Sequence, residues 1–156
     1  MSFDSVRAWL AEHAPDLAII DNGMSTATVA DAAFALGVEP ARIAKTLAVR
    51  VRDETFLLVT RGDARLDNQK TKAALGGRPR MLGPEETLAI TGHPVGGVCP
   101  FGLATPLPVY CDISLKAFDE VIPAAGSTHS ALRISPTQLA DLTDAKWVDV
   151  AQEPTA

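Results

Sequence analysis

The chain has 156 residues, a formal net charge of −5, and a composition that is 47% hydrophobic and 21% charged. This length predicts a single domain over residues 1–156, and the composition excludes a disordered chain. No apolar stretch is long enough to span a membrane and the first residues lack signal-peptide features, so we expect a cytoplasmic protein without a membrane partner. The two cysteines form no disulfide scaffold and no metal-binding motif, so neither a metal nor a cofactor is expected.

Apolar periodicity, capping residues and β-prone runs define the predicted elements in chain order. Helices are expected at 2–13, from Thr26 or Thr28 to 35, and at 40–45, 68–75, 84–91, 115–118 and 136–142. Strands are expected at 17–21, 46–51, 55–60, 80–82, 109–113, 131–134 and 146–150. Residues 152–156 are expected to form a frayed tail.

The fold class follows from the order of these elements. The runs 46–51 and 55–60 flank Arg52-Asp53-Glu54 and are typical of a hairpin at the centre of a sheet. Strands and helices then alternate irregularly, with two hairpin-like returns. This pattern favours an α/β (mixed α+β) fold with a mixed, largely antiparallel central sheet flanked by helices over a doubly wound parallel sheet.

Lys45 is the first candidate functional residue. It lies between apolar residues where a predicted helix meets a strand. Ligand sites are common at the end of a sheet, and partial burial there would perturb the pKa of a lysine. A lysine with its stem on the core and its ammonium in water fits the same pattern.

A glycine-rich segment, 92–102, is the second candidate. It contains four glycines and two prolines in eleven residues, and it matches neither a Walker motif nor the Gly-x-Gly-x-x-Gly order. Glycines allow backbone N–H groups to approach a ligand carbonyl or phosphate closely. A tight structural bend is the alternative.

Two further candidates lie in loops. Cys99 is a potential nucleophile if His93 or His129 pairs with it, although free cysteines are more often small buried apolar residues. The cluster Gly126-Ser127-Thr128-His129-Ser130 has hydroxyls and an imidazole that can orient a water or a substrate amine. A turn held by its own Ser and Thr side chains is the alternative.

Three of these motifs occur together in an informative order. They are Lys45-Thr46-Leu47 opening a strand, Gly92-x-x-x-Gly96-Gly97-Val98-x-Pro100-x-Gly102, and Gly126-Ser127 before an extended segment and a capped helix. In this order they resemble the YbaK and prolyl-tRNA synthetase editing-domain superfamily, over roughly residues 20–150. The resemblance implies a YbaK-like fold and a free-standing aminoacyl-tRNA deacylase that hydrolyses the ester of mischarged tRNA, with tRNA-Pro or a related tRNA as substrate.

The resemblance also assigns roles to residues. Lys45 would be the catalytic lysine near the terminal adenosine. Substrate-binding roles would fall to Thr46, Gly96, Gly97, Val98, Gly126, Ser127 and His129, with Gly126 and Ser127 on the wall opposite the Gly96-Gly97 loop. Backbone donors or a lysine ammonium can stabilise the oxyanion of ester hydrolysis, while water or a substrate group acts as nucleophile. Ser127-Thr128-His129 differs from the loops of cysteine-specific and alanine-specific members, so the amino acid removed stays open.

The charge distribution points to the RNA partner. Residues 42–80 contain ten basic and four acidic residues, whereas the rest of the chain has a balance of −11. A basic zone on an acidic protein is typical of contact with a polyanion, although a solvated mixed surface gives the same pattern. We expect Lys70 and Lys72 to bind the acceptor-stem phosphates of the aminoacyl-tRNA.

Two other functions fit the sequence. One is a non-catalytic adaptor that binds tRNA or an aminoacyl-tRNA synthetase, which is also an expected partner of the deacylase. The other is a thiol hydrolase that uses Cys99 and a histidine. Retention of Lys45 together with Gly96-Gly97 favours the deacylase over the adaptor.

Overall fold

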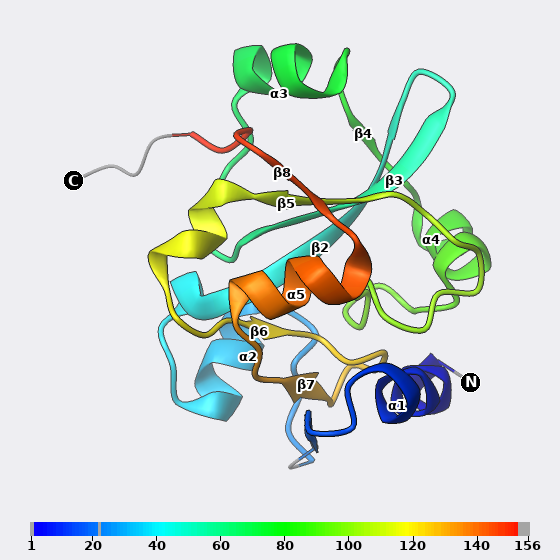
Figure 1. The fold of residues 1–156 in the computed structure, drawn as a ribbon, viewed down its shortest axis with the longest axis vertical. Coiled ribbons are helices and arrows are strands. Elements are labelled where there is room, and N and C mark those ends of the chain that lie inside the picture. Colours follow the sequence, from blue (N-terminus) through cyan, green and yellow to red (C-terminus); the bar gives the residue numbers. More distant parts are fainter. Residues whose placement is uncertain (1, 22, 153–156) are drawn as a thin grey trace.

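A long antiparallel hairpin forms the centre of the protein, whose computed structural model describes residues 2–21 and 23–152 (Figure 1). Its strands are β2 (Ile43–Val51) and β3 (Glu54–Arg61), joined by eight residue pairs from Ala44–Arg61 to Val51–Glu54. Residues 56–60 are all buried, as expected for a strand covered on both faces. Arg52 adopts a positive φ of 55° at the turn. The predicted hairpin is therefore confirmed, with longer strands than the sequence suggested.

The main sheet is mixed. Its order is β4-β2-β3-β5-β8, and β6 pairs with β2 beside that path. The additional strands are β4 (Arg80–Met81), β5 (Val109–Asp112), β6 (Ile122–Pro123) and β8 (Lys146–Val148). The β2–β3 and β2–β4 pairs are antiparallel, whereas β3–β5, β5–β8 and β2–β6 are parallel. A small antiparallel pair, β1 (Ile19–Ile20) with β7 (Ala131–Leu132), lies apart from it.

Five α-helices within the described residues surround the sheet, and local capping explains where four of them begin or end. They are α1 (Ser2–His13), α2 (Val29–Leu36), α3 (Asn68–Leu75), α4 (Pro84–Thr91) and α5 (Pro136–Thr143). Thr28, Asp67 and Ser135 each accept a backbone N–H of the first turn, and left-handed Gly37, Gly76 and Gly92 end three helices. No helix of the described chain is long and apolar enough to cross a membrane.

The main core lies between one face of the sheet and two helices. Val6 and Leu10 of α1 and Leu139 of α5 pack in one cluster with Ala48 and Leu57 from the central hairpin. In Figure 1, α5 crosses in front of the sheet and α1 lies below it. A separate cluster on the hairpin includes Val49 and Phe56, with Leu75 of α3 packed against it.

One prediction about the start of β2 was wrong. The helix expected at 40–45 is only a 3-10 turn, η1 (Pro40–Arg42), and the chain is a strand from Ile43 onward. Ile43 pairs with Ile122 of β6, while Ala44 pairs with both Pro123 and Arg61. These partners from distant segments override the local helical signal. Lys45 therefore lies within a strand.

Two other predictions involve residues outside the described ones. The turn expected at Asn22-Gly23 has only Gly23 described, with a φ of 79°. Of the predicted tail, residues 153–156 lie outside the described chain. At Gln152 the backbone N–H donates to the Arg65 carbonyl at 2.7 Å.

A buried carboxylate holds the ends of the parallel strands together. Asp112 is completely buried at the end of β5. Its two oxygens accept the backbone N–H of Val150 at 2.7 Å and that of Ser114 at 2.9 Å. Ser114 belongs to the 3-10 helix η2 (Ile113–Ala117). The side chain thus fixes both the turn after β5 and the segment after β8.

Replacing this carboxylate should destabilise the protein. Asp112→Ala leaves the buried Val150 N–H and the partly buried Ser114 N–H without an acceptor, and a fully buried unpaired group costs roughly 1–3 kcal/mol. We expect the free energy of unfolding to fall by about 2–4 kcal/mol in urea titrations. Asp141→Ala, at an exposed position on α5, is the matched control and should change it by about 0.5 kcal/mol or less. Equal stability of the two variants would contradict this role.

Candidate functional site

The candidate site begins with an unequal pairing of the two edges of β2. On one edge β3 pairs with the strand along its length. On the other edge, β6 pairs at Ile43 and Ala44, and β4 pairs at Val49 and Arg50. No described strand covers residues 45–48 there. The Leu82 N–H donates to the Ala48 carbonyl at 3.0 Å, so by alternation the N–H and C=O of Thr46 also face this gap.

A cavity of about 320 Å³ lies at this gap. Its lining comes from four parts of the chain around β2: residues 26–32, 81–87, 95–98 and 122–131 each contribute. Most lining residues are small and apolar, and Lys45 is the single charged one among the described lining residues. The cavity brings together Lys45, Thr46, Gly96 and Val98, four of the residues predicted to form a site.

The Lys45 side chain lies between this cavity and the segment that follows β3. The residue is partly buried, and its ammonium donates a 2.6 Å hydrogen bond to the Ala64 carbonyl. Burial lowers the pKa of Lys45 below its usual value. The negative charge of Asp63 opposes this shift, and the positive charge of Arg65 adds to it. The ammonium is therefore easier to deprotonate than that of an exposed lysine.

Thr46 contributes an unsatisfied hydroxyl. Its Oγ1 is buried and has no hydrogen-bond partner among the described residues. Buried hydroxyls nearly always have a partner, so an unpaired one beside a cavity is a candidate contact for a bound molecule. Two other lining threonines are already engaged, because Thr26 donates to the Ser130 carbonyl and Thr28 caps α2.

The two predicted glycine loops contact each other directly. The Gly126 N–H donates to the Gly97 carbonyl at 3.1 Å, and a Cβ on Gly97 would lie 2.8 Å from the Ser127 backbone nitrogen. Gly96 has a φ of 93°, which favours glycine. Gly126 and Ser127 thus lie against Gly97 and not on an opposite wall of the cavity. Gly97, Gly126, Ser127 and His129 are not among its lining residues.

The Ser127–Ser130 cluster is a turn held by its own side chains. The hydroxyls of Ser127 and Ser130 are 2.6 Å apart, and Ser127 Oγ accepts the His129 N–H at 3.2 Å. His129 is exposed, and its Nδ1 is 3.0 Å from Thr128 Oγ1. These bonds support the loop behind Gly97. A substrate-binding role for Ser127 and His129 stays a prediction.

Cys99 lies beside a histidine but is poorly suited to nucleophilic catalysis. Its Sγ is 3.7 Å from Nε2 of His93, and both residues are completely buried. Burial raises the pKa of the Cys99 thiol to about 12. His93 Nε2 also lies 2.7 Å from the Phe101 carbonyl, which requires that nitrogen to carry a proton. A protonated thiol without solvent access argues against the thiol hydrolase.

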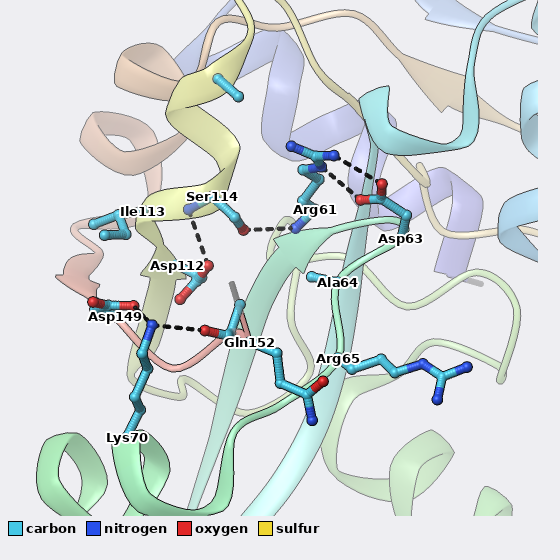
Figure 2. A pocket seen from close by; sticks show the side chains of 12 residues that line it. Arg61, Asp63, Ala64, Arg65, Lys70, Asp112, Ile113, Ser114, Asp149 and Gln152 are labelled. Atoms are coloured by element: carbon cyan, nitrogen blue, oxygen red, sulfur yellow. Dashed lines mark hydrogen bonds and ion pairs between the residues drawn. The ribbon is translucent and has the colours of Figure 1, made fainter. Parts of the chain in front are cut away.

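A second, more polar cavity of about 580 Å³ lies at the ends of β3 and β5 (Figure 2). Lys70 lines it, and its ammonium contacts the Asp149 carboxylate at 3.1 Å and the Ala151 carbonyl at 3.0 Å. Lys72 is exposed elsewhere on α3 and lines neither cavity. Lys70 therefore stabilises the C-terminal segment in this structure, and the RNA contacts of Lys70 and Lys72 stay predictions.

Sequence reasoning missed the residues directly after β3. Asp63 and Arg65 shift the pKa of Lys45, and Ala64 accepts its hydrogen bond. Their position was a usable signal, because polar residues that follow a buried strand often line ligand sites. Within residues 2–21 and 23–152, no group of three His, Cys, Asp or Glu side chains is placed to hold a metal ion.

Comparison with known proteins identifies the family. Residues 24–142 match the family model described as "aminoacyl-tRNA editing domain". The chain belongs to this family. An uncharacterized protein, YwhH of Bacillus subtilis, is 43% identical over 98% of this chain and 99% of its own length. The proline–tRNA ligase of Solidesulfovibrio magneticus is 36% identical over 67% of this chain, which covers 18% of the ligase.

Solved structures agree with this editing-domain assignment. A protein described as a candidate trans-editing enzyme for prolyl-tRNA synthetase has a TM-score of 0.89 and 34% identity, with 97% of this chain and 98% of that chain covered. The mixed α/β fold predicted for this editing domain is thereby confirmed. All residues that line the cavity at β2 lie within the matched residues 24–142.

The contact between the two glycine loops can be tested by adding a methyl group. Gly97→Ala would place Cβ against the Ser127 backbone, which cannot move aside as a flexible side chain can. We expect the free energy of unfolding to fall by about 1–3 kcal/mol, measured by urea denaturation. Gly83→Ala is the control, because nothing lies within 4 Å of that Cβ, and it should cost less than about 1 kcal/mol. The contact would be refuted if Gly97→Ala were no more costly than Gly83→Ala.

Proposed function

We propose that this editing domain is a free-standing deacylase that hydrolyses the ester of mischarged tRNA in trans, with tRNA-Pro or a related tRNA as substrate. The observation that carries the proposal is the partly buried Lys45 on the wall of an apolar cavity, beside the Gly96 loop. Family membership supports a deacylase role, and similarity to proline–tRNA ligases supports an aminoacyl-tRNA substrate and an association with that synthetase. Charged tRNA is abundant in the cytoplasm, where we expect the protein to act.

The proposed reaction needs no nucleophile from the protein. A water oxygen adds to the ester carbonyl carbon and gives up a proton. The bond from that carbon to the terminal ribose oxygen then breaks as the ribose oxygen takes up a proton, which releases the free amino acid and the uncharged 3′ end. The negative charge that develops on the carbonyl oxygen requires donors. The candidate donors are Lys45, the Thr46 N–H that faces the gap in β2 pairing, and backbone groups of the Gly96-Gly97 loop.

The cavity also favours one kind of aminoacyl group. Ala44, Ala48, Val98 and Ala124 contribute short apolar walls, and the volume of about 320 Å³ suits a small ligand. An amino acid with a small uncharged side chain would be desolvated there without leaving a buried charge unpaired. The unpaired Thr46 hydroxyl would supply one polar contact.

Hydrolysis of charged tRNAs tests the proposal directly. We expect the wild type to hydrolyse at least one of Cys-, Ala-, Ser- and Thr-tRNA. Lys45→Ala should lower the rate constant by about 100-fold or more, because loss of one oxyanion donor typically costs that much. Cys99→Ser and Lys146→Ala, an exposed lysine on β8, should retain activity.

Two results would overturn the proposal. Full activity of Lys45→Ala would remove the lysine from the mechanism. If no charged tRNA is hydrolysed but tRNA still binds, the protein is the non-catalytic adaptor that the sequence also allows.

The pH dependence tests the protonation state of Lys45. The mechanism needs the ammonium, so the rate corrected for spontaneous hydrolysis should fall as pH rises through a pKa below 10.5. Asp63 raises that pKa, so Asp63→Asn should move the alkaline fall to lower pH. Measured pH–rate profiles of the wild type and Asp63→Asn test this shift. A shift to higher pH would contradict the assignment of Lys45.

A further inference from the structure

The second cavity has a carboxylate lining that is already satisfied. Asp63 accepts both of its bonds from the Arg61 guanidinium, at 2.6 and 2.8 Å, and Asp112 accepts two backbone N–H groups. One oxygen of Asp149 accepts from Lys70. Five of the six carboxylate oxygens of these described residues therefore have a donor from the protein itself. The charges of Asp63 and Asp149 are balanced by Arg61 and Lys70, whereas Asp112 keeps its charge and is completely buried behind its two N–H donors.

The cations that line the same cavity are not all paired. Arg61 and Lys70 are paired with Asp63 and Asp149. Arg65 is exposed, and its guanidinium has no hydrogen bond or ion pair with any described residue. Figure 2 shows its side chain extending away from Asp112 and Asp149. Arg65 thus offers an unused planar set of donors at the edge of the cavity.

Arg65 also lies close to Lys45. It follows Ala64, whose carbonyl accepts a 2.6 Å hydrogen bond from the Lys45 ammonium. The positive charge of Arg65 lowers the pKa of that ammonium. Its own carbonyl is held by the Gln152 N–H at 2.7 Å, so the backbone position is fixed. Two nearby cations of which one lacks a counter-charge form a favourable place for an anion.

We propose that Arg65, together with Lys45, binds a phosphodiester group of the RNA next to its terminal nucleoside. This inference rests on the proposed function, which puts the ester in the cavity lined by Lys45. An ester in that cavity and a phosphate at Arg65 are joined by one nucleoside, and Lys45 lies between them. Arg65 therefore contacts the backbone of the single-stranded 3′ end, and this contact does not depend on the base sequence.

The phosphate has a second effect on Lys45. Burial and the Arg65 charge both favour loss of the Lys45 proton. A bound phosphate neutralises the Arg65 charge and adds a negative one, so it favours the protonated form. The correct RNA backbone thus keeps the ammonium charged while the ester is bound.

The first experiment measures binding without catalysis. The probe is an uncharged acceptor-stem hairpin with a single-stranded 3′ end, titrated by fluorescence anisotropy at several salt concentrations. Arg65→Gln should weaken binding about tenfold and reduce the slope of log K against log salt by about 1. Arg52→Gln removes the same charge at the exposed hairpin turn and should leave both quantities unchanged. Arg65→Lys should recover part of the slope.

The second experiment separates the phosphate contact from the chemistry. Arg65→Gln should lower kcat/KM about tenfold on an aminoacylated hairpin, mostly through KM. It should leave hydrolysis of a 2′(3′)-O-aminoacyl adenosine, which has no phosphate, unchanged. Lys45→Ala should lower the rates on both substrates.

The outcomes distinguish the two proposals. If Arg65→Gln binds RNA as Arg52→Gln does, or loses activity equally on both substrates, the phosphate site is overturned and the deacylase stands. If the wild type hydrolyses neither substrate, the deacylase fails, and the salt slopes alone decide whether Arg65 contacts a phosphate. If the wild type does not bind the hairpin, the phosphate site is overturned.

Discussion

The structure depends on how unequally the two edges of β2 are paired. One edge is paired with β3 from Ala44 to Val51. The other edge is shared by β6 and β4, which meet the strand at its two ends. The interval between them exposes backbone groups within an otherwise apolar surrounding. A closed strand edge would have removed the cavity, and a fully open one would have invited aggregation.

Lys45 couples this gap to the segment after β3. Lys45 lines the apolar cavity, and its ammonium donates to the carbonyl of Ala64, which lines the polar one. The electrostatic environment of one side chain is thus set from two directions, by an apolar wall and by a loop with charges of both signs. Partial burial makes the lysine sensitive to those charges, since fewer water molecules screen them.

Much of the fold could be predicted from local signals, whereas the site could be predicted only in part. Thr28, Asp67 and Ser135 as caps, and Gly37, Gly76 and Gly92 as helix ends, act within one turn of chain and are visible in sequence. The strand character of Ile43 and Ala44 depends on β6, some 80 residues away, and no local pattern encodes it. The same holds for the contact of Gly97 with Ser127 and of Lys45 with Ala64, which follow from long-range packing.

The anchoring of residues 65–67 by the C-terminal segment has a consequence for synthesis on the ribosome. Leu66 forms a bridge with Ala151, Asp67 donates its N–H to the Val150 carbonyl, and Gln152 donates to Arg65. These contacts span about 85 residues, so a nascent chain can form the β2–β3 hairpin long before it can fix this loop. The polar cavity is therefore completed late, after the hairpin that carries Lys45 has formed.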